Sequence, residues 1–263
     1  MRVLRFTPKP GSDLGSDPLF GVLEEDGSTI SVVNGDPLFN GLSNNGQQVK
    51  LEEVRLLAPV LPRSKVVCVG KNYSDHAKEM GGEVPAEPII FLKPNTSVAG
   101  PNDVIHWPWM SERIDHEAEL AIVIGRICKD VPRERASEVI FGFTIANDVT
   151  ARDLQSRDGQ WTRAKGFDTF CPIGPWIDTD FIPGNQELTC TVNGELKQKA
   201  TLNQMIFGVD EIIHFVTSVM TLLPGDVILT GTPAGIGPMP EKATVVCAIS
   251  GLGELTNKLS ARG

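Results

Sequence analysis

The sequence predicts an α+β fold that is mostly β, with a small N-terminal β-rich domain ahead of a larger one. Three observations carry this prediction: many short apolar segments separated by turn residues, one strong hairpin signal, and a single long amphipathic helical pattern. A chain of 263 residues that is 41% hydrophobic can bury cores for this arrangement.

The N-terminal region is predicted from its turn clusters. Short apolar segments alternate with turn-forming residues, for example at positions 25–28 and 34–37. Pro59 and Pro62 then interrupt the chain just before an apolar strand begins at Lys65. We therefore place a domain boundary here, with residues 1–58 as the small domain and residues 59–263 as the main domain.

The main domain is predicted to contain buried strands at 119–124 and 141–149, with a short helix at 133–139 between them. Asn193-Gly194 between two short apolar segments is typical of a two-residue β-hairpin. Apolar residues from Ile206 to Met220 recur at helical spacing and predict the one long amphipathic helix.

Composition argues against several classes of partner. The net charge of -9 is spread along the chain without a basic cluster, so we expect no nucleic-acid partner. No window approaches the roughly 18 apolar residues of a membrane span, and we infer no export signal. Five cysteines, widely spaced and without a C-x-x-C pair, favour buried thiols over disulfides or a zinc site. We expect a cytoplasmic protein.

Carboxylates cluster around the predicted strands. Glu117 and Glu119 share one face of an extended segment, Asp115 can join them, and Asp148 ends the next strand. If the strands are neighbours, the three residues Glu117, Glu119 and Asp148 can bind a divalent ion, and an all-oxygen site favours Mg²⁺, Mn²⁺ or Ca²⁺. The alternative is a solvated strand face whose glutamates pair with nearby arginines.

Further polar residues suggest catalysis, each with a plainer alternative. His76 and Glu79 share a face of a helical turn, so the carboxylate can orient the imidazole as a general base, or the pair can lie on a surface turn. Lys165 can neutralise a substrate carboxylate or be solvated. Thr232 belongs to a Gly/Pro-rich loop that can bind an anion or simply connect two strands.

Four motifs, in this order and spacing, resemble the fumarylacetoacetate hydrolase family. The resemblance covers roughly residues 64–255 and is more specific than any one motif. The motifs are Val69-Gly70-Lys71-Asn72-Tyr73 with Asp75-His76, His116-Glu117-Ala118-Glu119-Leu120, Asn147-Asp148-Val149-Thr150-Ala151-Arg152-Asp153, and Gly231-Thr232-Pro233.

The resemblance implies a mixed β-roll catalytic domain, a homodimer, and one Mg²⁺ or Mn²⁺ per subunit on the three carboxylates named above. It also implies that His76 and Glu79 form a dyad carried by a lid, with Lys165 beside the substrate. The predicted substrate-binding residues are Lys71, Tyr73, Gln155 and Thr232. Many relatives carry arginine at the position of Lys71, and lysine cannot give the same bidentate recognition of a carboxylate.

The predicted activity is metal-dependent C–C bond cleavage of small 2-oxo acids, by acylpyruvate hydrolysis, oxaloacetate decarboxylation or both, through a metal-stabilised enolate. One alternative is a 2-hydroxyhepta-2,4-diene-1,7-dioate isomerase or decarboxylase of aromatic catabolism. An alternative of another class is a noncatalytic β domain that a metal stabilises.

Overall fold

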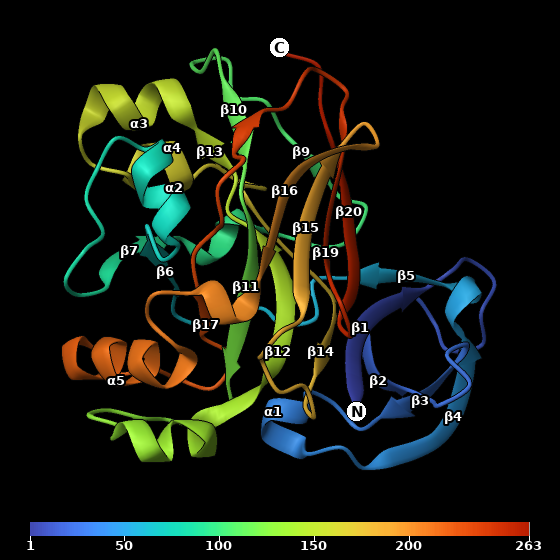
Figure 1. The fold of residues 1–263 in the computed structure, drawn as a ribbon. Helices are drawn as coiled ribbons and strands as arrows, with labels where there is room; N and C mark the ends of the chain where they lie inside the picture. Colours follow the sequence, from blue (N-terminus) through green and yellow to red (C-terminus); the bar gives the residue numbers. More distant parts are fainter. Residues whose placement is uncertain (263) are drawn as a thin grey trace.

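Alternating apolar residues build three β-sheets, and short helices gather at their edges (Figure 1). The computed structural model describes residues 1–262. The predicted α+β fold with mostly β-structure is confirmed.

The N-terminal strands form an antiparallel meander in the order β4-β3-β2-β1, and β5 also pairs with β1. The elements are β1 (Arg2–Pro8), β2 (Leu19–Leu23), β3 (Thr29–Val33), α1 (Pro37–Asn40), β4 (Asn44–Lys50), the 3₁₀ helix η1 (Leu51–Glu53) and β5 (Val54–Leu57). β1 also pairs with β14 of the main region, so one sheet runs through both parts of the chain. Separate domains divided at residue 58 stay a prediction.

The same sheet continues through the main region in the order β14-β12-β11-β17-β6-β7, with β8 beside β14. These strands are β6 (Val66–Gly70), β7 (Ile89–Lys93), β8 (Val98–Ala99), β11 (Ala118–Ile124), β12 (Ile140–Asn147), β14 (Cys171–Asp178) and β17 (Val227–Leu229). The predicted strands at 119–124 and 141–149 are therefore present and adjacent.

Two smaller sheets complete the β-structure. The five-stranded sheet has the order β16-β15-β19-β20-β9 and the three-stranded sheet the order β13-β10-β18. Their strands are β9 (Val104–Ile105), β10 (Ile114–His116), β13 (Thr150–Ala151), β15 (Glu187–Val192), β16 (Glu195–Thr201), β18 (Gly237–Pro238), β19 (Thr244–Ile249) and β20 (Gly253–Leu259).

Short helices fill the connections. They are α2 (Ser74–Glu79), η2 (Asn95–Ser97), η3 (Arg133–Val139), α3 (Arg152–Asp158), α4 (Thr162–Lys165), η4 (Leu202–Gln204) and α5 (Val209–Val219). Figure 1 shows α2, α3 and α4 together at one side of the sheets, with α5 and η3 further down. The predicted short helix is the 3₁₀ helix η3, and the predicted amphipathic helix is α5.

The hairpin between β15 and β16 has the predicted turn. Asn193 and Gly194 have φ values of 52° and 81°, both in the left-handed region that a type I′ turn requires. This hairpin places β16 at the edge of the five-stranded sheet, from where the Gln198 side chain donates a hydrogen bond to the Thr232 hydroxyl.

The central strand β11 is buried on both faces. Leu120, Ile122 and Ile124 belong to the core shared with the five-stranded sheet and α5. Ala121 and Val123 point the other way, into a second core that includes strands β6 and β14. Glu119 lies two residues before Ala121 in β11, so its side chain points to the same face of the strand as that of Ala121. A carboxylate at the start of such a strand is therefore carried into the interior.

All five cysteines are buried and free, in agreement with the prediction of buried thiols. Within residues 1–262, no helix combines the length and the apolar character that a membrane crossing requires.

Candidate metal centre and active site

Three carboxylates converge where β11 begins and β12 ends. Glu117 occupies the gap between β10 and β11, Glu119 is the second residue of β11, and Asp148 directly follows β12. The strands are antiparallel neighbours in which Ala118 pairs with Asn147, so the start of one lies beside the end of the other. Each carboxylate is buried and offers an oxygen within 4.8 Å of the other two.

Backbone contacts hold these side chains in place. The amide N–H of Gly231 donates to Glu119 Oε2 at 2.6 Å. Gly231 has a φ of +99°, and a Cβ on it would lie 2.6 Å from the Cβ of Asn72. Only glycine brings the backbone this close to the carboxylate without strain. The Gly231-Thr232-Pro233 loop therefore positions a predicted metal ligand.

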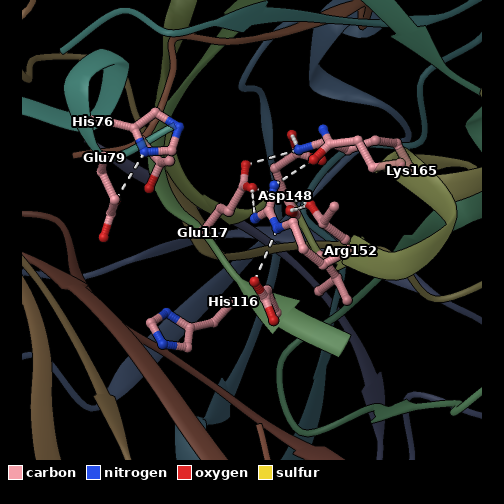
Figure 2. A network of polar contacts seen from close by, with 12 residues as sticks. His76, Glu79, His116, Glu117, Asp148, Arg152 and Lys165 are labelled. Carbon is pink, nitrogen blue, oxygen red and sulfur yellow. Dashed lines mark hydrogen bonds and ion pairs between the residues drawn. The ribbon is translucent and has the colours of Figure 1, made fainter. Parts of the chain in front are cut away.

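Buried cations surround two of the three carboxylates. Lys165 Nζ donates to Glu117 Oε2 at 2.8 Å and to Asp148 Oδ2 at 2.6 Å. Lys93 Nζ donates to Asp148 Oδ1 at 2.5 Å. Arg152 bonds to Glu117 Oε1 through one guanidinium nitrogen. Figure 2 shows Lys165 and Arg152 directed toward Glu117 and Asp148. We call Glu117, Glu119, Asp148, Arg152 and Lys165 the floor of the site.

The two glutamates of the floor differ in their pKa values. Burial is the largest influence on both and by itself raises a carboxyl pKa. The charges of Lys165 and Arg152 outweigh burial at Glu117 and hold its pKa below the usual value. At Glu119 the negative charges of Asp148 and Glu117 add to burial, so its pKa lies well above the usual value. Among residues 1–262, Glu119 is thus the carboxylate of the three that has no ion-pair partner within 4.0 Å.

The donor set fits a divalent cation. Among residues 1–262, Glu119 has no cationic side chain within 4.0 Å, and its bond to Gly231 leaves further lone pairs free. A buried carboxylate in this state either binds a proton or finds a cation. Three carboxylates with no nitrogen or sulfur donor suit Mg²⁺ or Mn²⁺ and leave coordination positions for substrate.

A histidine–glutamate pair lies above the floor on α2. His76 is 5% exposed and its Nδ1 lies 3.2 Å from Glu79 Oε2. The Glu79 carboxylate also accepts the amide N–H of Gly235 at 3.1 Å, which joins α2 to the loop after β17. In Figure 2, His76 and Glu79 come from α2 on the opposite side of Glu117 from Lys165. We call α2 with the following residues 80–82 the lid.

One small cavity connects lid and floor. Its volume is about 30 Å³, and it is lined by Val69, Gly70, Lys71, His76, Met80, Phe91, Glu117, Glu119, Asp148, Arg152, Gln155, Trp161, Lys165 and Thr232. The structure therefore brings together most of the predicted site residues. The predicted residues Tyr73 and Glu79 do not line this cavity: the Tyr73 hydroxyl is buried and has no hydrogen-bond partner within residues 1–262, and Glu79 lies behind His76.

The predicted substrate residue Thr232 is already engaged by the protein. Its hydroxyl donates to the carbonyl oxygen of Ala118 at 2.9 Å and accepts from Gln198 Nε2 at 2.8 Å. Gln198 Oε1 accepts the amide N–H of Ala118 at 3.0 Å and faces His116 Nδ1 at 3.1 Å. Gln198 thus ties the loop to the strand that carries the metal ligands, and a direct substrate contact by Thr232 stays a prediction.

Sequence reasoning missed three residues that shape the site: Lys93, Arg152 and Gln198. Arg152 lies in one of the four motifs, and its position beside Asp115 and Glu117 links it to two buried carboxylates. Lys93 ends an apolar strand, and a lysine there is a signal that an anion lies within reach. No local sequence pattern indicated a role for Gln198, because its hydrogen-bond partners are distant in the sequence.

Comparisons with known proteins identify the family of this chain. The profile of the Fumarylacetoacetate (FAA) hydrolase C-terminal family matches residues 65–260, and an Rv2993c-like N-terminal profile matches residues 1–59. The mitochondrial oxaloacetate tautomerase FAHD2B of Bos taurus is 43% identical over 249 residues, which cover 90% of this chain and 78% of that protein.

Two solved structures are also similar. The 2-hydroxyhepta-2,4-diene-1,7-dioate isomerase from Mycobacterium marinum shares 48% identity, covers 100% of this chain and 99% of its own, and gives a TM-score of 0.89. The fumarylpyruvate hydrolase from Pseudomonas aeruginosa, in complex with Mn²⁺ and pyruvate, shares 33% identity over 79% of this chain and 92% of its own, with a TM-score of 0.72.

The named relatives are enzymes: a tautomerase, an isomerase and a hydrolase. The predicted family resemblance is confirmed by the profile match over most of the chain and by the identity to these relatives. With its buried carboxylate cluster and its histidine–glutamate pair, this chain belongs to the fumarylacetoacetate hydrolase family.

Proposed function

We propose that this protein is a divalent-metal-dependent enzyme that cleaves a C–C bond in small 2-oxo acids, with acylpyruvate hydrolysis as its main reaction. The single observation behind this proposal is that His76, held by Glu79, lines the same cavity as Glu117, Glu119 and Asp148. A general base and an all-carboxylate metal site then act on one substrate. Mg²⁺ or Mn²⁺ bound by the three carboxylates would act as a Lewis acid toward the 2-oxo oxygen of the substrate.

The floor binds the 2-oxo end of the substrate in this proposal. Lys165 and Arg152 are buried cations, so they can offset the negative charge of a carboxylate brought into the cavity. Gln155, 9% exposed, also lines the cavity, and its Oε1 accepts a hydrogen bond from Arg152 Nη1 at 2.5 Å. That bond leaves the amide group of Gln155 free to donate to a substrate oxygen.

The lid supplies the base. With Glu79 accepting a hydrogen bond from the Nδ1–H group of His76, Nε2 is left to accept a proton from water, and the carboxylate stabilises the imidazolium that results. The hydroxide attacks the distal carbonyl carbon of the acylpyruvate, and the bond from that carbon to C3 of the pyruvate portion breaks. His76 then returns its proton to C3, so the products are pyruvate and a carboxylic acid.

The lid must also open. A cavity of about 30 Å³ holds an ion with one or two waters, whereas a 2-oxo acid of four or more carbons needs more room. The segment after α2 contains Gly81, with a φ of +70°, and Gly82, which suit a hinge.

Oxaloacetate decarboxylation needs no attacking water. Replacement of His76 should therefore lower the rate of hydrolysis much more than the rate of decarboxylation.

A second candidate is tautomerisation or isomerisation of the same kind of acid. The names of the relatives from Bos taurus and Mycobacterium marinum favour it, since both describe proton transfer without C–C cleavage. Proton transfer to and from C3 uses His76 as base and acid but consumes no water.

The noncatalytic alternative finds no support among the named relatives, all of which are enzymes. Formation of a homodimer stays a prediction.

The test compares acetylpyruvate hydrolysis, oxaloacetate decarboxylation and oxaloacetate enol–keto conversion with Mg²⁺, with Mn²⁺ and with EDTA. Glu119→Ala controls for decarboxylation by free metal, and His76→Asn separates the reactions. We expect His76→Asn to lower hydrolysis by about a hundredfold or more while decarboxylation persists. Equal loss of both reactions would contradict this division of roles, and enol–keto conversion without any cleavage would establish the second candidate.

A further inference from the structure

A larger cavity lies between the N-terminal strands and the main region. Its volume is about 350 Å³, compared with about 30 Å³ for the cavity between lid and floor, and no residue lines both. Its walls come from β1, β2, α1, residues 59–61, β12 and β14. In Figure 1, α1 lies beside the N-terminal strands and below β12 and β14. Small-molecule sites commonly have this size, whereas well-packed interiors leave few voids larger than a water molecule.

Most of the wall of this cavity is apolar. Phe20 of β2 and Leu38 of α1 form it on the N-terminal side, and Val60 and Phe141 form it on the side of the main region. Leu61 also lines the cavity and is 55% exposed, so the cavity opens to solvent there. A small molecule can therefore enter from the surface and bury an apolar group inside.

Arg5 supplies a positive charge to this apolar wall. Side chains alternate along β1, and Leu4 and Phe6 belong to the N-terminal core, so Arg5 points to the opposite face. Within residues 1–262, its guanidinium has no carboxylate within 4.0 Å and no hydrogen-bond acceptor. Its Cζ lies 6.0 Å from the centre of the Phe20 ring, at the outer limit of a cation–π contact. The charge of Arg5 is thus left for a ligand.

Asp36 lines the same cavity but does not pair with Arg5. Its Oδ1 accepts the N–H of Leu38 at 3.0 Å. Burial lowers the pKa of the Arg5 guanidinium, and the charge of Asp36 offsets this effect only in part. Because a guanidinium in a protein does not lose its proton, Arg5 keeps its charge in this half-buried position. An anion bound beside it would compensate for the lost hydration.

We propose that this cavity binds a small carboxylic acid with one negative charge and an apolar body, and that Arg5 binds its carboxylate. A guanidinium matches a carboxylate through two parallel N–H···O bonds. The charge of Asp36 disfavours a second negative charge on the ligand, and the walls around Phe20 and Phe141 suit an aromatic or aliphatic group. This site goes beyond the proposed function, since it shares no residue with the metal centre.

The test titrates the protein in EDTA with 4-phenylbutanoate and with 4-phenylbutanamide, which has nearly the same shape but no charge. We expect calorimetry to show binding of the carboxylate with a Kd at least about tenfold lower than that of the amide. Arg5→Met should weaken carboxylate binding by about tenfold to a hundredfold and leave amide binding unchanged. Arg126→Met, at an exposed arginine two residues after β11, is the matched control and should bind both like wild type.

Two outcomes of this titration would overturn the inference. One is the absence of carboxylate binding in wild type. The other is carboxylate binding that Arg5→Met leaves unchanged, which would place the ligand elsewhere, for example beside the cations of the floor. None of these readouts requires turnover, so they do not depend on whether the proposed hydrolysis occurs.

A stability measurement distinguishes a ligand site from a structural role of Arg5. Without ligand, Arg5→Met removes a half-buried charge that has no ion-pair partner within 4.0 Å among residues 1–262, so the free energy of unfolding should be unchanged or raised. With saturating 4-phenylbutanoate, Tm should rise in wild type but not in Arg5→Met. Leu38→Trp keeps Arg5 but fills the cavity, and it should also abolish the rise. A loss of ligand-free stability in Arg5→Met would make Arg5 structural and contradict the inference.

Sedimentation at the same protein concentrations tests a different occupant of the cavity, a second copy of this chain. We expect Arg5→Met to leave the molecular mass unchanged. A lower mass of the variant would assign the cavity to an interface between copies, and the proposed carboxylate site would then be wrong.

Discussion

The floor and the lid of the site are built in different ways. The floor side chains come from strand ends and from helices α3 and α4, are at most 8% exposed, and form a network of buried ion pairs. The lid is one short helix of six residues followed by Met80 and two glycines. Its contact with the loop after β17 is a hydrogen bond from Gly235 to Glu79, whose side chain is 34% exposed.

This difference in construction suits the floor and the lid to different tasks. Buried ion pairs between neighbouring strands fix positions closely but tolerate change poorly, because removal of one charge leaves its partner buried and unpaired. A short helix with few buried contacts opens at low free-energy cost. Under the proposed function, the floor is therefore suited to binding the 2-oxo acid and a metal ion, and the lid to admission of the substrate.

The largest expected effect distinguishes two members of the floor. Asp148→Asn leaves the ammonium groups of Lys93 and Lys165 without one of their carboxylates, so we expect a loss of about 3–5 kcal/mol in the free energy of unfolding. Glu119→Gln replaces a carboxyl group that has no ion-pair partner within 4.0 Å among residues 1–262, and it should leave metal-free stability unchanged or raised. Urea unfolding in EDTA at pH 8 measures both, and equal destabilisation would contradict the assignment of unpaired charge to Glu119.

Metal binding should be the next largest effect and should depend on pH. Because the folded-state pKa of Glu119 is raised, this carboxyl group contributes its full stabilisation of the metal-free protein only below the ordinary glutamate pKa. That stabilisation is lost as the pH rises through the folded-state pKa of Glu119. A divalent ion binds the ionised form, so stabilisation by Mn²⁺ should be larger at pH 8 than at pH 5.5. At a free-ion concentration a hundredfold above Kd it should reach about 2.7 kcal/mol.

Thermal unfolding with and without Mn²⁺ across this pH range is the measurement. Glu119→Gln serves as the control, and its unfolding should respond far less to the ion. A stabilisation of equal size in wild type and variant would show that the ion binds elsewhere.

A smaller effect on stability is expected where the floor meets the Gly231-Thr232-Pro233 loop. Gln198→Leu removes the acceptor for Ala118 N–H and the donor to Thr232, both buried, so we expect a loss of about 1–3 kcal/mol in stability. KM should rise because the loop loses its fixed position. Gln204→Leu on the neighbouring η4, which removes one exposed hydrogen bond from the Thr201 N–H, is the comparison for urea unfolding and steady-state kinetics. A raised KM without any loss of stability would show that Gln198 contacts the substrate itself.

The smallest effect concerns the lid. Glu79→Gln keeps the size of the side chain but weakens the orientation of His76 and the bond from Gly235, so we expect hydrolysis to fall by about tenfold with unfolding unchanged. Glu83→Gln, at an exposed residue just beyond the lid, should have no effect. If Glu79→Gln instead lowered decarboxylation as much as hydrolysis, the lid would serve closure alone.

Much of the fold and part of the floor could be predicted from local pattern. Glu117, Glu119 and Asp148 each lie on or beside an apolar strand, and strand periodicity suffices to group the two glutamates. Lys93 and Arg152 could not be placed, because Lys93 reaches Asp148 across 55 positions in the sequence and Arg152 reaches Glu117 across 35. Such contacts depend on which strands become neighbours, and neither periodicity nor motif spacing determines that order.

The pairing of β1 with β14 has a consequence for protein engineering. Arg2 and Val3 lie opposite Asp178 and Ile177 within one continuous sheet. A chain shortened to begin near residue 60 would leave the Ile177–Asp178 end of β14 without its partner strand and uncover Trp176, which packs against the core that contains Leu4 and Phe6. Free strand edges recruit other chains, so such a fragment should be prone to self-association. We therefore expect the first strand to protect the main region against aggregation.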